Sequence, residues 1–259
     1  MDIPFTKASA CGNDFLIIDG TLTPDRLNEL TRQICDRHNG VGADGVEWLF
    51  AASDADVEAR LVNADGSDAE ISGNGTRCVA AYLCAETKKE SVTIRTGAGV
   101  KKCTLVARSG NTFEFEAAMG VPRVDAEMSI PTSFGEVKGI PVSMGNPHFV
   151  MFVEQFWADW QARSAEMQRN SIFKQGINIE VVYVQDKFNI DVRFFERGVG
   201  ETQSSGTGSS AAGVASIATG RAQSPVIVHA PGGTQTVRFE QEVFLRGPAT
   251  LISEGRFFV

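Results

Sequence analysis

EISGNGTRCVAAYL, at residues 70–83, joins a glycine-rich turn to an apolar stretch. A small polar residue followed by Gly-x-Gly is typical of a helix N-terminus, because the hydroxyl group can cap the first turn. The unpaired N–H groups of that turn and the helix dipole favour an anion, and glycine lets a ligand approach the backbone closely. The stretch therefore predicts either an ordinary helix cap or a carboxylate site, and the rest of the chain decides between them.

The chain carries this turn twice. Three pairs of segments are separated by the same distance along the sequence: GN (12–13) with GN (145–146), DVEARLVN (56–63) with NIDVRFFE (189–196), and SGNG (72–75) with SGTG (205–208). Loop composition can explain any one of these pairs, but three pairs in one order at one spacing indicate an internal duplication.

Each half repeats the same succession of elements. A helix is predicted at 23–38, with Pro24 near its start, and another at 154–168, from the spacing of their apolar residues. An alternating strand follows in each half, and then a helix of small residues that opens at the glycine-rich turn. We predict an α+β fold of two homologous domains, residues 1–122 and 123–259, each a mainly antiparallel sheet wrapped around a central helix.

Composition excludes several classes of protein. The net charge of −8 disfavours a nucleic-acid partner, which would require a basic surface. The sequence shows no secretory signal and no apolar run of the roughly 18–20 residues that a membrane span needs, so we expect a cytoplasmic protein with no membrane partner. The five cysteines form no CxxC pair and the three histidines lie far apart, a pattern that predicts neither a disulfide framework nor a metal site.

A duplicated anion-binding turn suggests a particular chemistry. Inversion at a carbon requires one group that removes the α-proton and a second that returns a proton to the opposite face. We expect the two helix N-termini to face one cleft and to hold a substrate carboxylate, with Ser72 and Ser205 on opposite sides of it. The polar residues near the matched turns are candidates for orienting the ligand: Asn13, Asn63, Asn74, Asn146, His148, Asn178, Glu196 and Arg197.

Five motifs resemble those of the diaminopimelate epimerases: CGNDFLIID (11–19), RHNGVGADGV (37–46), NADGSDAEISGNGTRC (63–78), SMGNPHFV (143–150) and ERGVGETQSSGTGSSAA (196–212). The resemblance covers nearly the whole chain in the same order. It implies an isomerase that interconverts LL- and meso-diaminopimelate by two-base α-proton transfer, without pyridoxal phosphate or any other cofactor. It also implies a role in lysine and peptidoglycan-precursor synthesis, a homodimer, and a last strand, within 249–259, that packs on the first half.

The resemblance assigns roles to individual residues. The family's substrate contacts fall on Asn13, Asn63, Gly73, Asn74, Asn146, Asn178, Glu196, Arg197, Gly206 and Thr207. His148 and Glu196 match the pair that adjusts the catalytic acid and base. The two catalytic positions fall on Ser72 and Ser205, where the family pattern has cysteine.

This departure leaves three hypotheses open. A thiol at a helix N-terminus can ionise near neutral pH, whereas a serine hydroxyl cannot, and Cys78 is placed to be a core residue rather than a substitute. Under the first hypothesis, the chain is a diaminopimelate epimerase impaired by serine at both positions, whether introduced or native. Alternatively it is an isomerase or racemase of another substrate with a different base, such as Glu196 or a serine–His148 arrangement, or an amino-acid-binding homologue without activity.

Overall fold

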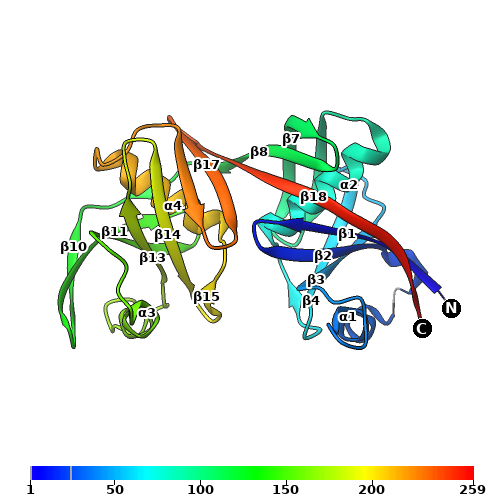
Figure 1. Ribbon diagram of the computed structural model, residues 1–259, viewed down its shortest axis with the longest axis horizontal. Helices are drawn as coiled ribbons and strands as arrows, with labels where there is room; N and C mark the ends of the chain where they lie inside the picture. The colour runs from blue at the N-terminus through cyan, green and yellow to red at the C-terminus, as the bar shows by residue number, and fades with distance from the viewer. Residues whose placement is uncertain (1, 24) are drawn as a thin grey trace. The chain divides into compact units, whose positions relative to one another are not determined.

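The computed structural model describes residues 2–23 and 25–259, which form two compact units (Figure 1). Unit 1 comprises the described residues up to Ala117 together with Gly247–Val259, and unit 2 comprises Ala118–Arg246. Each unit has a buried helix among its strands and a shorter helix packed on its sheet. No helix of the described residues combines the length and the apolar character that crossing a membrane requires.

Unit 1 is built from the following elements: β1 (Asp2–Ala10), β2 (Asn13–Asp19), η1 (Gly20–Leu22), α1 (Leu27–Cys35), β3 (Gly45–Phe50), β4 (Val57–Asn63), β5 (Asp68–Ala69), α2 (Gly73–Thr87), β6 (Ser91–Thr96), β7 (Gly99–Ser109) and most of β8 (Thr112–Gly120).

Unit 2 is built from a second set: β9 (Arg123–Val124), β10 (Met128–Thr132), β11 (Gly135–Ser143), β12 (Pro147–Val153), α3 (Trp160–Gln168), β13 (Asn178–Val184), β14 (Asn189–Glu196), β15 (Gly200–Thr202), α4 (Gly206–Ala218), β16 (Val226–Ala230) and β17 (Gly233–Phe239). The last strand, β18 (Val243–Phe258), begins in unit 2 and continues in unit 1, where it pairs antiparallel with β1.

The strand pairings of the two units follow one plan. In unit 1, β2 is antiparallel to β1 and parallel to β3, and β4 is antiparallel to β3 and parallel to β6. In unit 2, β12 is antiparallel to β11 and parallel to β13, and β14 is antiparallel to β13 and parallel to β16. Equivalent strands thus lie at equivalent places in two α+β units, as expected for an internal duplication.

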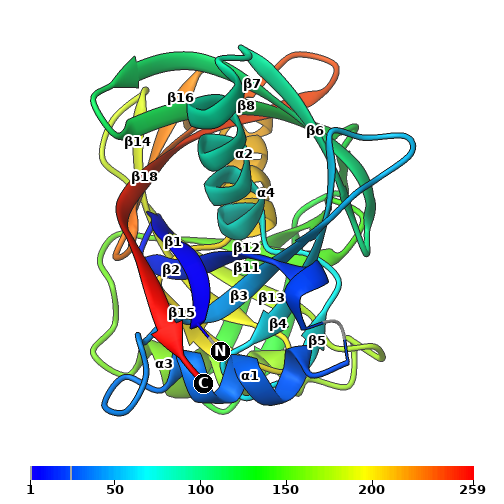
Figure 2. The same ribbon diagram turned by 90° about the vertical axis from the view of Figure 1, so that its right-hand side faces the viewer.

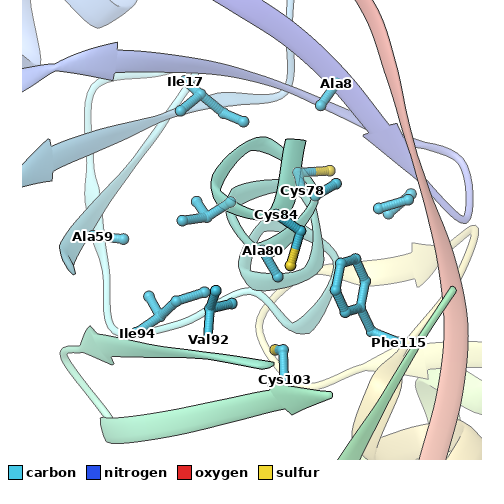
Figure 3. Packing of buried hydrophobic residues seen from close by; sticks show 14 of the residues in the cluster. Ala8, Ile17, Ala59, Cys78, Ala80, Cys84, Val92, Ile94, Cys103 and Phe115 are labelled. Atoms are coloured by element: carbon cyan, nitrogen blue, oxygen red, sulfur yellow. The ribbon is translucent and has the colours of Figure 1, made fainter. Parts of the chain in front are cut away.

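Small side chains allow each central helix to be enclosed. Figures 2 and 3 show α2 with strands around it. The side chains of Cys78, Ala80 and Cys84 on this helix are at most 2% exposed and pack in one core cluster with residues such as Phe115. The burial of Cys78 confirms its expected place in the core. In α4, a Cβ on Gly213 would lie 2.8 Å from the Cβ of Val237 on β17, so a larger residue would push the helix off its sheet.

The surface helices are shorter than predicted. The helix expected at 23–38 spans only Leu27–Cys35, because the side chain of Asp36 accepts the N–H groups of His38 and Asn39 and turns the chain; Pro24 lies outside the described residues. The helix expected at 154–168 begins at Trp160. Phe156 precedes it and packs against the ring of Tyr183.

Each Gly-Asn turn joins two antiparallel strands. A turn at Cys11 and Gly12, both of which have positive φ, joins β1 to β2. A turn at Gly145 likewise divides β11 from β12. The strands β3 and β13 lie between the predicted elements, and both carry a buried glutamate.

Candidate active site

Both central helices begin with a serine cap. The hydroxyl of Ser72 accepts a hydrogen bond from the N–H of Gly75 at 3.1 Å, and the hydroxyl of Ser205 accepts one from Gly208 at the same distance. Both serines have extended backbone, as N-cap residues do. Their hydroxyl groups therefore stabilise the first turns of α2 and α4, directly before the predicted contact residues Gly73 and Gly206.

An asparagine from the preceding strand pair contacts each helix start. In unit 1, the amide of Asn74 donates to Oδ1 of Asn13 at 2.8 Å. In unit 2, Asn146 donates to Oγ1 of Thr207 at 3.3 Å. The two contacts join duplicated positions, so the structure brings four of the predicted residues together, two in each unit.

Arg77 fixes the orientation of the contact in unit 1, and sequence analysis did not identify it. Its guanidinium is buried and donates to Oδ1 of Asn74, to the carbonyl of Pro248 and to the sulfur of Cys11. Because the carbonyl oxygen of Asn74 is engaged by Arg77, its amide N–H group is directed to Asn13.

A buried acid–base pair lies next to the helix start in unit 2. Nδ1 of His148 is 2.7 Å from Oε1 of Glu180, and each side chain is only 1% exposed. Burial raises the pKa of the Glu180 carboxyl, while His148 opposes that shift. On its other side, Nε2 of His148 lies 3.0 Å from Oδ1 of Asn146.

These contacts fix the number of protons that the pair holds. Since Oδ1 of Asn146 can only accept, Nε2 of His148 donates to it. The short contact between Nδ1 and Glu180 then needs one more proton, carried either by the imidazole or by the carboxyl group. The two side chains therefore share one proton, and hydrogen bonds connect Glu180 through His148 and Asn146 to Thr207.

Unit 1 has the corresponding acid without the histidine. Glu47 and Glu180 are separated along the chain by the spacing that relates the duplicated segments, and at that spacing Phe15 occupies the position that corresponds to His148. Glu47 is 3% exposed, and no hydrogen bond or ion pair to its side chain occurs among the described residues. Desolvation raises the pKa of its carboxyl to about 8, so Glu47 is mostly protonated at neutral pH.

Each acid lies against the third residue of its helix. A Cβ on Gly75 would overlap Oε1 of Glu47 and lie 3.3 Å from the Cβ of Ser72. In unit 2, a Cβ on Gly208 would lie 3.0 Å from Oε1 of Glu180 and 2.9 Å from the Cβ of Ser205. Glycine at this position thus allows a carboxyl group to occupy the space beside the capping serine.

Asn178 and Arg197 form a second group of predicted residues. The amide of Asn178 donates to the carbonyl of Pro147 at 3.0 Å, and its Oδ1 accepts the backbone N–H of Arg197 at 2.9 Å. The Arg197 guanidinium donates to the carbonyl of Gln175. Asn178 also pairs with His148 in the parallel register of β12 and β13, so this group adjoins the acid–base pair.

Asn63 and Glu196, which occupy duplicated positions, have separate partners. Asn63 donates to Oγ of Ser67 at 3.0 Å, and Oε1 of Glu196 accepts the hydroxyl of Thr202 at 2.6 Å. Within the described ranges, neither side chain is hydrogen bonded to the capped turns. Glu196 is nevertheless close enough to Glu180 to raise the pKa of that carboxyl.

Sequence analysis missed the two buried glutamates, although a signal for them was present. Glu47 and Glu180 share the spacing that relates the three matched pairs of segments. Extending the alignment of the halves to GVEWLF (45–50) and NIEVVYV (178–184) would have paired them.

We expect Gly75→Ala to destabilise unit 1 by about 1–3 kcal/mol, because the new methyl group overlaps the buried carboxyl of Glu47. Gly73→Ala is the matched control on the same helix, since no heavy atom of the described residues lies within 4 Å of a Cβ there. Urea denaturation of both variants measures the difference. Equal stabilities would contradict the close packing of Glu47 against α2.

The chain is similar to known enzymes over its whole length. The sequence model of the family described as diaminopimelate epimerase matches residues 5–124 and 140–252. A diaminopimelate epimerase from Halothermothrix orenii is 35% identical, with 100% of this chain and 99% of the relative covered. One from Elusimicrobium minutum is 36% identical, with 98% of each covered.

Solved structures show the same fold at low sequence identity. A phenazine biosynthesis protein of the PhzF family from Bacillus anthracis matches with a TM-score of 0.75 at 16% identity, covering 100% of both chains. A probable proline racemase from Agrobacterium radiobacter matches with a TM-score of 0.72 at 18% identity, covering 98% of this chain and 92% of its own. The two-domain α+β fold predicted from the sequence is confirmed, and the sequence matches show that this chain belongs to the diaminopimelate epimerase family.

Proposed function

We propose that this protein is a cofactor-independent isomerase that interconverts LL- and meso-diaminopimelate by transfer of the α-proton. Family membership supports the substrate, because the relatives matched over their full lengths bear the name diaminopimelate epimerase. The observation that carries the proposal is the duplicated site, in which each unit combines a capped helix N-terminus with a buried carboxyl group.

The helix starts supply the binding chemistry. N–H groups in the first turn of a helix have no acceptor within the helix, and they attract the substrate carboxylate together with the helix dipole. The same groups stabilise the negative charge that spreads into this carboxylate when the α-proton leaves. Asn74 and Thr207 hold their side chains beside these turns, and Asn178 and Arg197 are placed to orient the remainder of the ligand.

Ser72 and Ser205 have a different role from the cysteines of the family pattern. Each hydroxyl caps a helix and is too weak an acid to carry charge at neutral pH. The groups in their neighbourhood that can exchange a proton there are the His148–Glu180 pair and Glu47. An epimerase with serine at both positions therefore depends on these groups, rather than on a thiol pair, for its proton transfer.

Isotope exchange tests the proposed function. The protein is incubated with LL-diaminopimelate in deuterated water, and both deuterium incorporation at the α-carbon and formation of the meso isomer are measured. We expect exchange accompanied by inversion. The Ser72→Cys/Ser205→Cys variant is the comparison, because it restores the thiols of the family pattern in the same fold.

The comparison separates the alternatives. Activity only in the double cysteine variant would show that the substrate is correct and that the serine protein lacks proton-transfer groups. No exchange in either protein, with no thermal shift on adding diaminopimelate, would contradict the assignment of this substrate. Exchange of a different amino acid under the same conditions would favour a racemase or isomerase of another substrate.

We also propose that the protein is a cytoplasmic homodimer that supplies lysine and peptidoglycan-precursor synthesis. Family membership supports this assignment. Analytical ultracentrifugation measures the oligomeric state directly, and a monomer at micromolar concentration would contradict the dimer.

A further inference from the structure

We propose that Glu47 exchanges the α-proton with the substrate on the side of unit 1, in place of the thiol that the family pattern has at position 72. This inference rests on the proposed function and identifies the group of that site that moves the proton. It assigns a role to a residue outside the set identified from the sequence.

Glu47 is buried without the partners that a structural carboxylate requires. An ionised carboxylate in a protein interior is strongly destabilising unless it is paired or hydrogen bonded. Glu47 is 3% exposed and has neither kind of partner among the described residues. Glu58, on the neighbouring strand β4, shows the usual arrangement, a partly exposed carboxylate paired with Arg60.

The Glu47 carboxyl group lies beside the glycine-rich turn at the start of α2, which contains position 72. Its carboxyl oxygen occupies the space where a Cβ of Gly75 would be, and the Cβ of Ser72 borders the same space. The carboxyl group is therefore next to position 72 at the N-terminus of α2. A side chain at this place can replace a thiol that projects from position 72.

The duplication provides a second, independent indication. The equivalent acid of unit 2, Glu180, has one oxygen bonded to His148 and the other, Oε2, buried without a partner among the described residues. Both units thus place a protonatable carboxyl group beside the third residue of the central helix. They differ because Phe15 replaces the histidine in unit 1, which leaves Glu47 a neutral acid rather than a member of a pair.

The asymmetry assigns a direction to each proton transfer. On the side of unit 1, neutral Glu47 can give its proton: the O–H bond breaks, the electron pair that the substrate carbanion holds forms the new Cα–H bond, and the Glu47 carboxylate remains. In the reverse direction the Cα–H bond breaks, its electron pair stays on the substrate and spreads into the carboxylate, and the Glu47 carboxylate takes the proton. The group that exchanges a proton on the other face of the carbon returns to its starting state over the full cycle. No other reactant is required.

The raised pKa of Glu47 supports this assignment, because a proton-transfer group works best with a pKa near the operating pH. The neighbouring thiol of Cys78, on α2, is also buried, and desolvation keeps its pKa well above its usual range, so it does not compete for the proton.

The test compares exchange from each stereoisomer. Glu47→Gln, Glu47→Asp and the control Glu58→Gln are incubated separately with LL- and with meso-diaminopimelate in deuterated water. We expect Glu47→Gln to lower the rate of inversion by at least about 10²-fold. This variant should still exchange the α-proton of one stereoisomer, because the group that acts on the other face of the carbon can still remove a proton and return a deuteron there.

Glu47→Asp retains a carboxyl group and should recover part of the inversion rate, while Glu58→Gln should match the unaltered protein. Undiminished inversion in Glu47→Gln would overturn the proposal, as would equal losses of exchange from both isomers in a variant that still folds and binds. If Glu47→Gln does not fold, Glu47→Asp decides. The proposal is overturned if folded Glu47→Asp inverts the substrate as fast as the unaltered protein, and also if it does not invert the substrate at all. Absence of exchange in the unaltered protein contradicts the proposed function instead.

Discussion

Replacing His148 by phenylalanine should lower the free energy of unfolding by about 3–5 kcal/mol at pH 8. The substitution reproduces the arrangement of unit 1 with a ring somewhat larger than imidazole, and it removes the one hydrogen-bond partner that buried Glu180 has among the described residues. The loss should be smaller at pH 5, because burial raises the pKa of Glu180 and the carboxyl can then take up a proton. Urea denaturation at the two pH values measures both effects.

A second substitution provides the control. Replacing both members of a buried pair by apolar residues of similar shape is often neutral or stabilising, whereas removing one member is costly. The double variant His148→Phe/Glu180→Leu should therefore recover most of the stability that His148→Phe loses. Additive losses in the double variant would show that the two side chains do not interact.

The stability of the protein should fall as the pH rises from about 4.5 to 8, and Glu47→Gln should remove much of this fall. Glu47 has a pKa of about 8 in the folded protein and a reference pKa of 4.5, so between these values folding takes up a proton. The free energy of unfolding then decreases by roughly 1.4 kcal/mol for each pH unit that separates the two pKa values. Above pH 8 both states are ionised, and this contribution becomes constant.

The difference between the two proteins isolates the contribution of Glu47. Other buried groups, including Glu180, titrate in both proteins and cancel when the curve of Glu47→Gln is subtracted from that of the unaltered protein. Urea denaturation at half-unit steps from pH 4.5 to 9 gives the difference curve. A flat difference would mean that Glu47 is ionised in the folded protein, and it would remove the support that its pKa gives to a role in proton transfer.

The two predictions concern one structural difference between duplicated units. A single substitution, histidine in unit 2 and phenylalanine in unit 1, separates a paired acid from an unpaired one.

Short-range signals made the two capped turns predictable. The caps at Ser72 and Ser205 were predicted because a helix cap and its glycines are adjacent in sequence. Asn13 and Asn146 were selected from the duplication, and their role in binding a ligand stays a prediction. The family followed from motifs in sequence order. The boundary between the halves after residue 122 stays a prediction.

The strands that carry the two acids escaped prediction for a physical reason. Both β3 and β13 have a parallel neighbour and are buried on both faces at their first residues, so they lack the alternation of apolar and polar residues that marks a half-exposed strand. Their glutamates also conflict with the usual composition of a buried strand.

The sequence by itself determined the duplication, the capped helix starts and the family, because each depends on residues close in the chain or repeated at a fixed spacing. Only the tertiary structure decided which side chains meet. Glu47 reaches Gly75 of α2 from strand β3, and Glu180 reaches His148 from the adjacent strand, in both cases across a long stretch of intervening sequence. The protonation of Glu47 and Glu180 depends on burial and on side chains of neighbouring strands. Residues adjacent to each glutamate in the sequence determine neither of these.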